Sequence, residues 1–94
     1  MIALSETEEL ENKRKRLRFR SWHRGTRESD LLLGSFADRH IEAFDEDQLE
    51  RYAALIECND PDIYNWMTGR EAVPAEHDND VMRLLRDHQY RPAL

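Results

Sequence analysis

The segment HRGTRE at positions 23–28 places opposite charges and a glycine between a dense basic run and three consecutive leucines. Arg24 and Glu28 are four positions apart, a spacing at which oppositely charged side chains can meet on one face of a helix. Gly25 lies inside this pattern, although glycine within a helix costs roughly 1 kcal/mol relative to alanine. Two interpretations stay open. The glycine either marks a turn beside an ordinary surface pair, or it lets the backbone of a binding partner approach closely.

Residues 24–36 separate into two sides when they are placed on a helical wheel at about 100° per residue. Leu32, Leu33 and Phe36 cluster on the side that is expected to face a core. The opposite side combines both signs of charge with one apolar residue, and its members are Arg24, Arg27, Glu28, Leu31 and Ser35. A charged rim around an exposed leucine is typical of a surface that contacts another protein.

This outward surface supplies the predicted site. Its partner-binding residues are Arg24, Gly25, Arg27, Glu28, Asp30 and Leu31. Asp30 is included because its carboxylate is expected to orient the neighbouring arginines. We predict no catalytic, metal-binding or cofactor-binding residue, because the four histidines are scattered, the single cysteine cannot complete a zinc site, and no serine has an evident base.

The charge of the 94-residue chain is unevenly distributed. Residues 13–27 hold eight of the fourteen basic side chains and no acid, although the formal net charge is −6. Such a basic segment on an acidic protein suits either an acidic protein surface or a nucleic acid. The single cysteine fits a reducing compartment, and neither a targeting peptide nor an apolar run of roughly 20 residues is recognised. These features predict a bacterial cytoplasmic protein without membrane insertion.

Apolar residues recur at three- and four-residue intervals, which predicts an all-α fold, a compact bundle of five short helices. The first helix is expected to start after Ser5, and the second to span about residues 25–44. The third is expected to start at the cap Asp45, and the fourth at the cap Asp60 and to stop at Gly69. The fifth is expected to follow Pro74 and to end at Arg91-Pro92. The expected core consists of Leu32, Leu33, Phe36, Ala37, Ile41, Leu49, Tyr52, Ala53, Ile56, Ile63, Trp66, Met67, Val81, Leu84, Leu85 and His88. Residues 1–94 are expected to form one domain, with residues 1–12 partly disordered.

An ordered series of segments resembles the small succinate dehydrogenase assembly factors that promote covalent attachment of FAD. The segments are RKRL at 14–17, the Arg-Gly-x-x-Glu signature at 24–28, LLLGSFADRHI at 31–41, DEDQLERYAALIECNDPDIYNW at 45–66 and VMRLLRDH at 81–88. The chain departs from the family at His23, where relatives are often basic, and at Thr26, where they often have methionine. Neither difference changes the signature itself.

The resemblance implies a non-enzymatic assembly factor that docks on the flavoprotein subunit of succinate dehydrogenase, and in some bacteria of fumarate reductase. FAD would be attached to a histidine of that partner and not bound by this chain. The signature residues would make the contact, with Arg27 and Leu31 extending it. The alternative is a small helical regulator or antitoxin that binds a toxin or nucleic acid through the basic first helix; nucleic acid is the less favoured partner.

Overall fold

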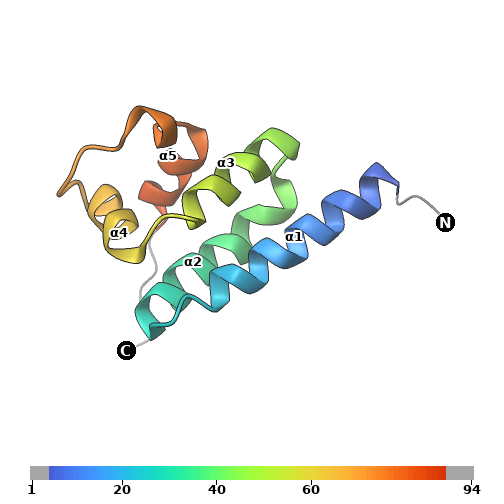
Figure 1. Cartoon of the computed structure of the whole chain (residues 1–94), viewed down its shortest axis with the longest axis horizontal. Helices are drawn as coiled ribbons and strands as arrows, with labels where there is room; N and C mark the ends of the chain where they lie inside the picture. Colours follow the sequence, from blue (N-terminus) through green and yellow to red (C-terminus); the bar gives the residue numbers. More distant parts are fainter. Residues whose placement is uncertain (1–4, 89–94) are drawn as a thin grey trace.

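Two long antiparallel helices, α1 (Glu6–Trp22) and α2 (Arg27–His40), lie side by side in the computed structural model, which describes residues 5–88 (Figure 1). The connections α1–α2 and α3–α4 lie at the same end of the molecule, opposite the start of α1. Within the described range there is no strand, and the predicted all-α fold of five helices is confirmed. The remaining elements are η1 (Ile41–Ala43), α3 (Glu46–Ile56), α4 (Asp60–Thr68), η2 (Ala75–His77) and α5 (Asp80–Asp87), of which η1 and η2 are 3-10 helices.

Side-chain caps begin the helices at the predicted starts of α1 and α3. The Ser5 hydroxyl accepts a hydrogen bond from the Glu8 backbone N–H at 3.2 Å. Asp45 and Gln48 form a full capping box, in which each side chain accepts a hydrogen bond from the backbone N–H of the other residue. Gly69, with φ of +79°, ends α4 as predicted.

The predicted cap of α4 is wrong. Asn59 caps this helix, because its Oδ1 accepts a hydrogen bond from the Asp62 backbone N–H at 3.0 Å. Asp60 is the first helical residue instead. Its carboxylate therefore does not cap α4 and pairs with Arg24 instead.

The predicted limits of α2 are also too wide. Gly25 has a φ of +110°, which is incompatible with a helix, so α2 begins only at Arg27. At its other end α2 stops at His40 and continues as the 3-10 helix η1. α5 ends at Asp87, and its predicted end at Arg91-Pro92 lies outside the described residues.

The core lies where all five α-helices meet, and most of the residues predicted for it are buried. Leu32, Ala53, Met67, Leu84 and His88 are only half-buried. Sequence periodicity also missed four members, which are Leu17, Phe44, Leu55 and Met82. The buried apolar residues are Leu17, Leu33, Phe36, Ala37, Ile41, Phe44, Leu49, Tyr52, Leu55, Ile56, Ile63, Trp66, Val81, Met82 and Leu85.

Gly34 allows α1 and α2 to approach each other closely just beside their connection. A Cβ atom added at Gly34 would lie 2.2 Å from the nearest ring atom of Trp22, far inside contact distance. The Trp22 indole N–H also donates a hydrogen bond to Asp38 on α2 at 3.2 Å. The end of α1 is thereby fixed against α2 immediately before the HRGTRE segment.

We expect Gly34→Ala to lower the free energy of unfolding by about 1–2 kcal/mol, because overpacking outweighs the better helix propensity of alanine. In a Trp22→Ala background the ring is absent, and the same substitution should stabilise by up to about 1 kcal/mol. Denaturant unfolding followed by circular dichroism measures both effects. Equal effects in the two backgrounds would contradict the close contact.

A buried hydroxyl network joins the first three helices. The Ser21 hydroxyl donates to the Leu17 carbonyl at 2.7 Å, and the Tyr52 hydroxyl lies 2.5 Å from Ser21 Oγ and 3.4 Å from the Leu33 carbonyl. Burial raises the pKa of Tyr52 to about 12, because the phenolate would have to be formed away from water. The neutral phenol thus holds α3 against α1 and α2.

Because the pKa of Tyr52 is raised above its ordinary value of 10.0, this tyrosine should stabilise the folded state less as pH rises. Its contribution is fully present below pH 10 and is lost between pH 10 and about 12. We expect the free energy of unfolding of the wild type to fall by up to about 2–3 kcal/mol more than that of Tyr52→Phe over this window. Denaturant unfolding of both proteins at a series of pH values measures this difference. If the free energies of unfolding of the wild type and Tyr52→Phe fall in parallel, the raised pKa of Tyr52 does not contribute to stability.

Candidate partner-binding site

The HRGTRE segment forms a tight turn between α1 and α2, and Asp30 organises its backbone. Asp30 Oδ1 accepts hydrogen bonds from the backbone N–H groups of Arg24 at 2.5 Å and Gly25 at 3.3 Å. Thr26 then caps α2, with its hydroxyl oxygen accepting from the Ser29 N–H at 3.2 Å. Asp30 was expected to orient neighbouring arginines, and it holds one of them, Arg24, through its backbone N–H.

The Arg24 guanidinium points into the molecule and joins this turn to the connection between α3 and α4. Its Nη1 donates to the Ile56 carbonyl at 2.6 Å and its Nη2 to the Cys58 carbonyl at 2.9 Å. Its Nε and Nη2 lie 2.9 Å and 2.8 Å from Asp60 Oδ1. The Ile56 carbonyl ends α3 without an intrahelical partner, and such carbonyls attract cations. One side chain thus joins the end of α3, the loop carbonyl of Cys58 and the first residue of α4.

The outward placement of Arg24 on a helical wheel is therefore wrong. Only 11% of its side chain is exposed, and Arg24 precedes α2 and is not part of it. The wheel failed because it assumed helical geometry across Gly25, where the chain turns. Ser35 was also expected to face solvent, but it is half-buried, with its Oγ 2.9 Å from His88 Nε2.

The other predicted site residues remain accessible around the turn. Gly25, Arg27 and Glu28 are exposed, whereas Leu31 is half-buried. No atom lies within 4 Å of a Cβ built at Gly25, so the space in front of this glycine is open. Its positive φ confirms the interpretation that Gly25 marks a turn. The ordinary surface pair of Arg24 with Glu28, which that interpretation included, is not formed, because the guanidinium faces α3 and α4.

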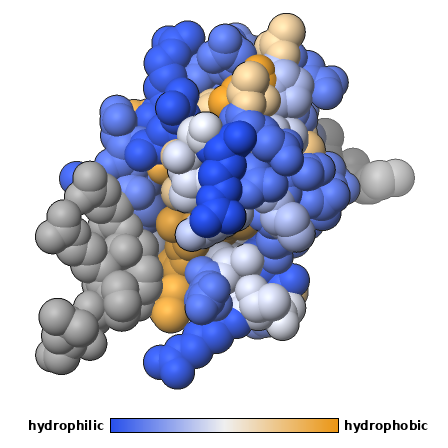
Figure 2. Space-filling model, turned by 90° about the vertical axis from the view of Figure 1, so that its left-hand side faces the viewer, coloured by the Kyte–Doolittle hydropathy of each residue, from blue (hydrophilic) through white to orange (hydrophobic). Residues whose placement is uncertain are grey.

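A groove between α2 and α4 adjoins the turn. Figure 2 looks onto the side of the molecule that carries α4 and the start of α2, and shows hydrophobic surface running between hydrophilic side chains. No pattern in the sequence indicates this groove directly, because its two walls are about 30 residues apart along the chain. The described residues lining it are Thr26, Arg27, Glu28, Ser29, Leu31, Leu32, Leu33, Asp60, Pro61, Ile63 and Tyr64.

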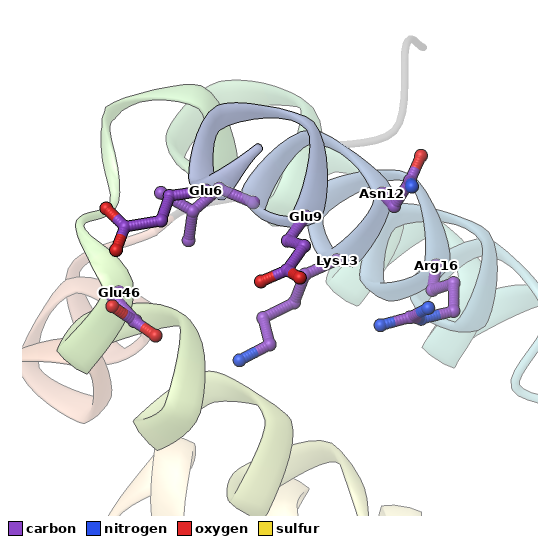
Figure 3. A pocket seen from close by; sticks show the side chains of 7 residues that line it. Glu6, Glu9, Asn12, Lys13, Arg16 and Glu46 are labelled. Atoms are coloured by element: carbon purple, nitrogen blue, oxygen red, sulfur yellow. The ribbon is translucent and has the colours of Figure 1, made fainter. Parts of the chain in front are cut away.

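A second hollow, between the start of α1 and α3, has a different character. In Figure 3 the side chains of Glu6, Glu9 and Glu46 surround it together with Lys13. Leu10 is the one apolar residue among the described residues that line it. Charged side chains of both signs suit a solvated surface, so the apolar groove is the stronger candidate for a binding site.

Most of the basic run is engaged within the protein. Arg14 donates to the carbonyls of Ile41 at 3.2 Å and Phe44 at 3.0 Å. The other internal partnerships are Lys13 with Glu50, Arg18 with Asp38 and Glu42, and Arg20 with Glu57. Affinity for nucleic acid depends largely on cations that are available to neutralise phosphates. The pairing therefore weakens the alternative of a nucleic-acid-binding first helix.

Cys58 lies in the connection between α3 and α4, beside His77. Burial, followed by the negative charges of Glu76 and Asp62, raises the pKa of its thiol. Its sulfur lies 3.3 Å from His77 Nε2 in a half-buried contact.

Among the described residues, no group of three or more histidine, cysteine or acidic side chains is arranged to hold a metal ion. Within the same range, no helix is long and apolar enough to cross a membrane.

The described residues thus form a small helical bundle with a braced turn beside an apolar groove. The chain belongs to the family described as Flavinator of succinate dehydrogenase, whose sequence model matches residues 15–89. This finding confirms the family that the sequence predicted.

Named relatives support the same family. The chain is 43% identical over 84 residues to succinate dehydrogenase assembly factor 2, mitochondrial, of Dictyostelium discoideum, covering 89% of this chain and 60% of the relative. It is 45% identical over 83 residues to the protein of the same name from Aedes aegypti, covering 86% and 52%. The chain thus spans between about half and three fifths of the length of these relatives. Their names place those proteins in mitochondria and do not support a bacterial location.

We expect Arg24→Ala to lower the free energy of unfolding by about 2–3 kcal/mol, because the carbonyls of Ile56 and Cys58 and the carboxylate of Asp60 lose their partner. Arg27→Ala is the matched control. Arg27 is exposed and makes no ion pair within the described part of the chain, so its replacement should change stability by less than about 0.5 kcal/mol. Denaturant unfolding measures the stability of both variants. Equally small decreases in the free energy of unfolding would show that the contacts of Arg24 do not stabilise the fold.

Proposed function

We propose that this protein is an accessory assembly factor that binds the flavoprotein subunit of succinate dehydrogenase and promotes covalent attachment of FAD to a histidine of that subunit. The observation that carries the proposal is the exposed signature turn, with Gly25, Arg27 and Glu28 beside an apolar groove, in a member of this family. The flavoprotein subunit of fumarate reductase is a second predicted partner. A bacterial cytoplasmic location stays a prediction.

The proposed contribution of this chain is geometric. In covalent flavinylation the 8α-methyl group of the flavin gives up a proton, and a histidine nitrogen of the partner, losing its own N–H proton, bonds to that carbon. The flavin ring takes up the electron pair and two protons, so the attached flavin is first formed in its reduced state. What remains is to hold the partner's histidine and flavin in a reactive orientation, which can be worth several kcal/mol. A small protein seated on the flavoprotein can supply this effect without a catalytic centre of its own.

The signature residues divide into two roles in this proposal. Arg24 and Asp30 brace the turn from within, so Arg24 acts as a positioning residue and not as a contact. Glu28 and Arg27 present opposite charges to the partner, and the open space at Gly25 admits its backbone. Bracing matters because a contact surface that is already ordered loses less conformational entropy on binding.

Glu28→Gln tests the assigned contact without disturbing the fold. Glu28 is exposed, so its neutral isostere should leave the melting temperature unchanged while covalent flavin on the partner's subunit falls by about tenfold or more. Flavin fluorescence of the subunit in a denaturing gel, with purified components and added FAD, measures the yield. Gly25→Arg is a poorer test, because its φ of +110° would strain any side chain.

Glu11→Gln, an exposed glutamate on α1 far from the turn in sequence, is the matched control and should retain the wild-type yield. If the yield of covalent flavin is the same for Glu28→Gln and Glu11→Gln, Glu28 does not contact the partner and the assigned site is wrong. If the wild type itself fails to raise the yield, the proposed function is wrong. Tight binding to duplex DNA that weakens steeply with salt would then favour the regulator alternative.

A further inference from the structure

We infer that the groove between α2 and α4 receives an apolar side chain of the flavoprotein subunit, carried on a segment with an acidic and a basic residue beside it. This inference rests on the proposed function and extends it from the signature turn to α4. The groove begins at Thr26 and Arg27 and continues across Leu31 and Leu32 to Pro61 and Tyr64, so turn and groove form one continuous surface.

Exposed aromatic residues single out this groove. In the described part of the chain, Phe19 and Tyr64 are large hydrophobic residues with exposed side chains, at 62% and 52%. The ring of Phe19 is covered on one face by His23, with the two ring centroids 3.9 Å apart. Tyr64 instead borders the groove, with Arg70 6.0 Å from its ring centroid. An aromatic side chain at the edge of an apolar groove is a frequent anchor of protein interfaces.

The dimensions of the groove fit one segment of a large partner. Its volume of about 1110 Å³ lies above the range of roughly 300–1,000 Å³ that is usual for small-molecule sites. Eleven described residues line it, whereas each side of a stable protein dimer contributes about 20–30. The groove therefore suits a side chain and its flanking residues, with further contacts made by the neighbouring turn.

The charges at the groove determine the chemistry of the segment. Asp60 is already paired with Arg24 at 2.8 Å and offers little charge to a partner. Arg27 and Glu28 are exposed at the mouth, and neither forms an ion pair within residues 5–88. A bound segment would place a carboxylate near Arg27 and a cation near Glu28. Such complementarity sets the orientation of the segment more than the strength of its binding.

Tyr64→Glu and Phe19→Glu are a matched pair, because each places a carboxylate at an exposed aromatic position on the surface of a helix. Both should fold with nearly wild-type stability. The affinity for purified flavoprotein subunit without covalent FAD, measured by biolayer interferometry, should fall about tenfold or more for Tyr64→Glu and stay within about twofold for Phe19→Glu. Tyr64→Phe should bind like the wild type.

The outcomes separate this inference from the proposed function. If Glu28→Gln weakens binding and Tyr64→Glu does not, the groove is not used and the inference is wrong, while the proposed function stands. If the wild type does not bind the subunit at all, the proposed function fails first. If Tyr64→Glu instead converts a dimer into a monomer in light scattering and leaves subunit affinity unchanged, a second copy occupies the groove and the inference is overturned.

Discussion

The arrangement of this small protein depends on where the Arg24 guanidinium finds its partners. By donating to the carbonyls of Ile56 and Cys58 and pairing with Asp60, it holds together two connections that are separate in the sequence. Without it, the carbonyls of Ile56 and Cys58 and the carboxylate of Asp60 would lack this partner at a half-buried position. The position of α4, and with it one wall of the groove, therefore follows from a residue of the α1–α2 turn.

Local signals predicted most of the fold. The Ser5 and Asp45 caps, the stop at Gly69 and the three- and four-residue spacing of apolar side chains each act within one helical turn, so the sequence displays them directly. The cap of α4 was assigned one residue late because Asn59 and Asp60 are both good caps. Only the ion pair with Arg24, a contact between distant segments, explains why Asp60 faces elsewhere.

The candidate site was predicted in part. The glycine and charges of the HRGTRE segment indicated a turn and a contact surface, and Gly25, Arg27 and Glu28 are indeed exposed at a turn. The inward direction of Arg24 could not be predicted, because an arginine side chain is long enough to serve either solvent or a neighbouring helix. The groove could not be predicted from the sequence either, since Tyr64 and the α2 residues that line it come together only when the chain folds.

The ion pairs along α1 bear on how the protein meets other molecules. Lys13, Arg18 and Arg20 each lie against an acidic residue of a neighbouring segment, so at a distance their charges are largely cancelled. The net charge of −6 then dominates the long-range field, which would repel an acidic surface and not draw it in. In physiological salt this field is screened within roughly 10 Å. The rate of association with another protein should therefore depend on the complementarity of the two contact surfaces more than on long-range electrostatic attraction.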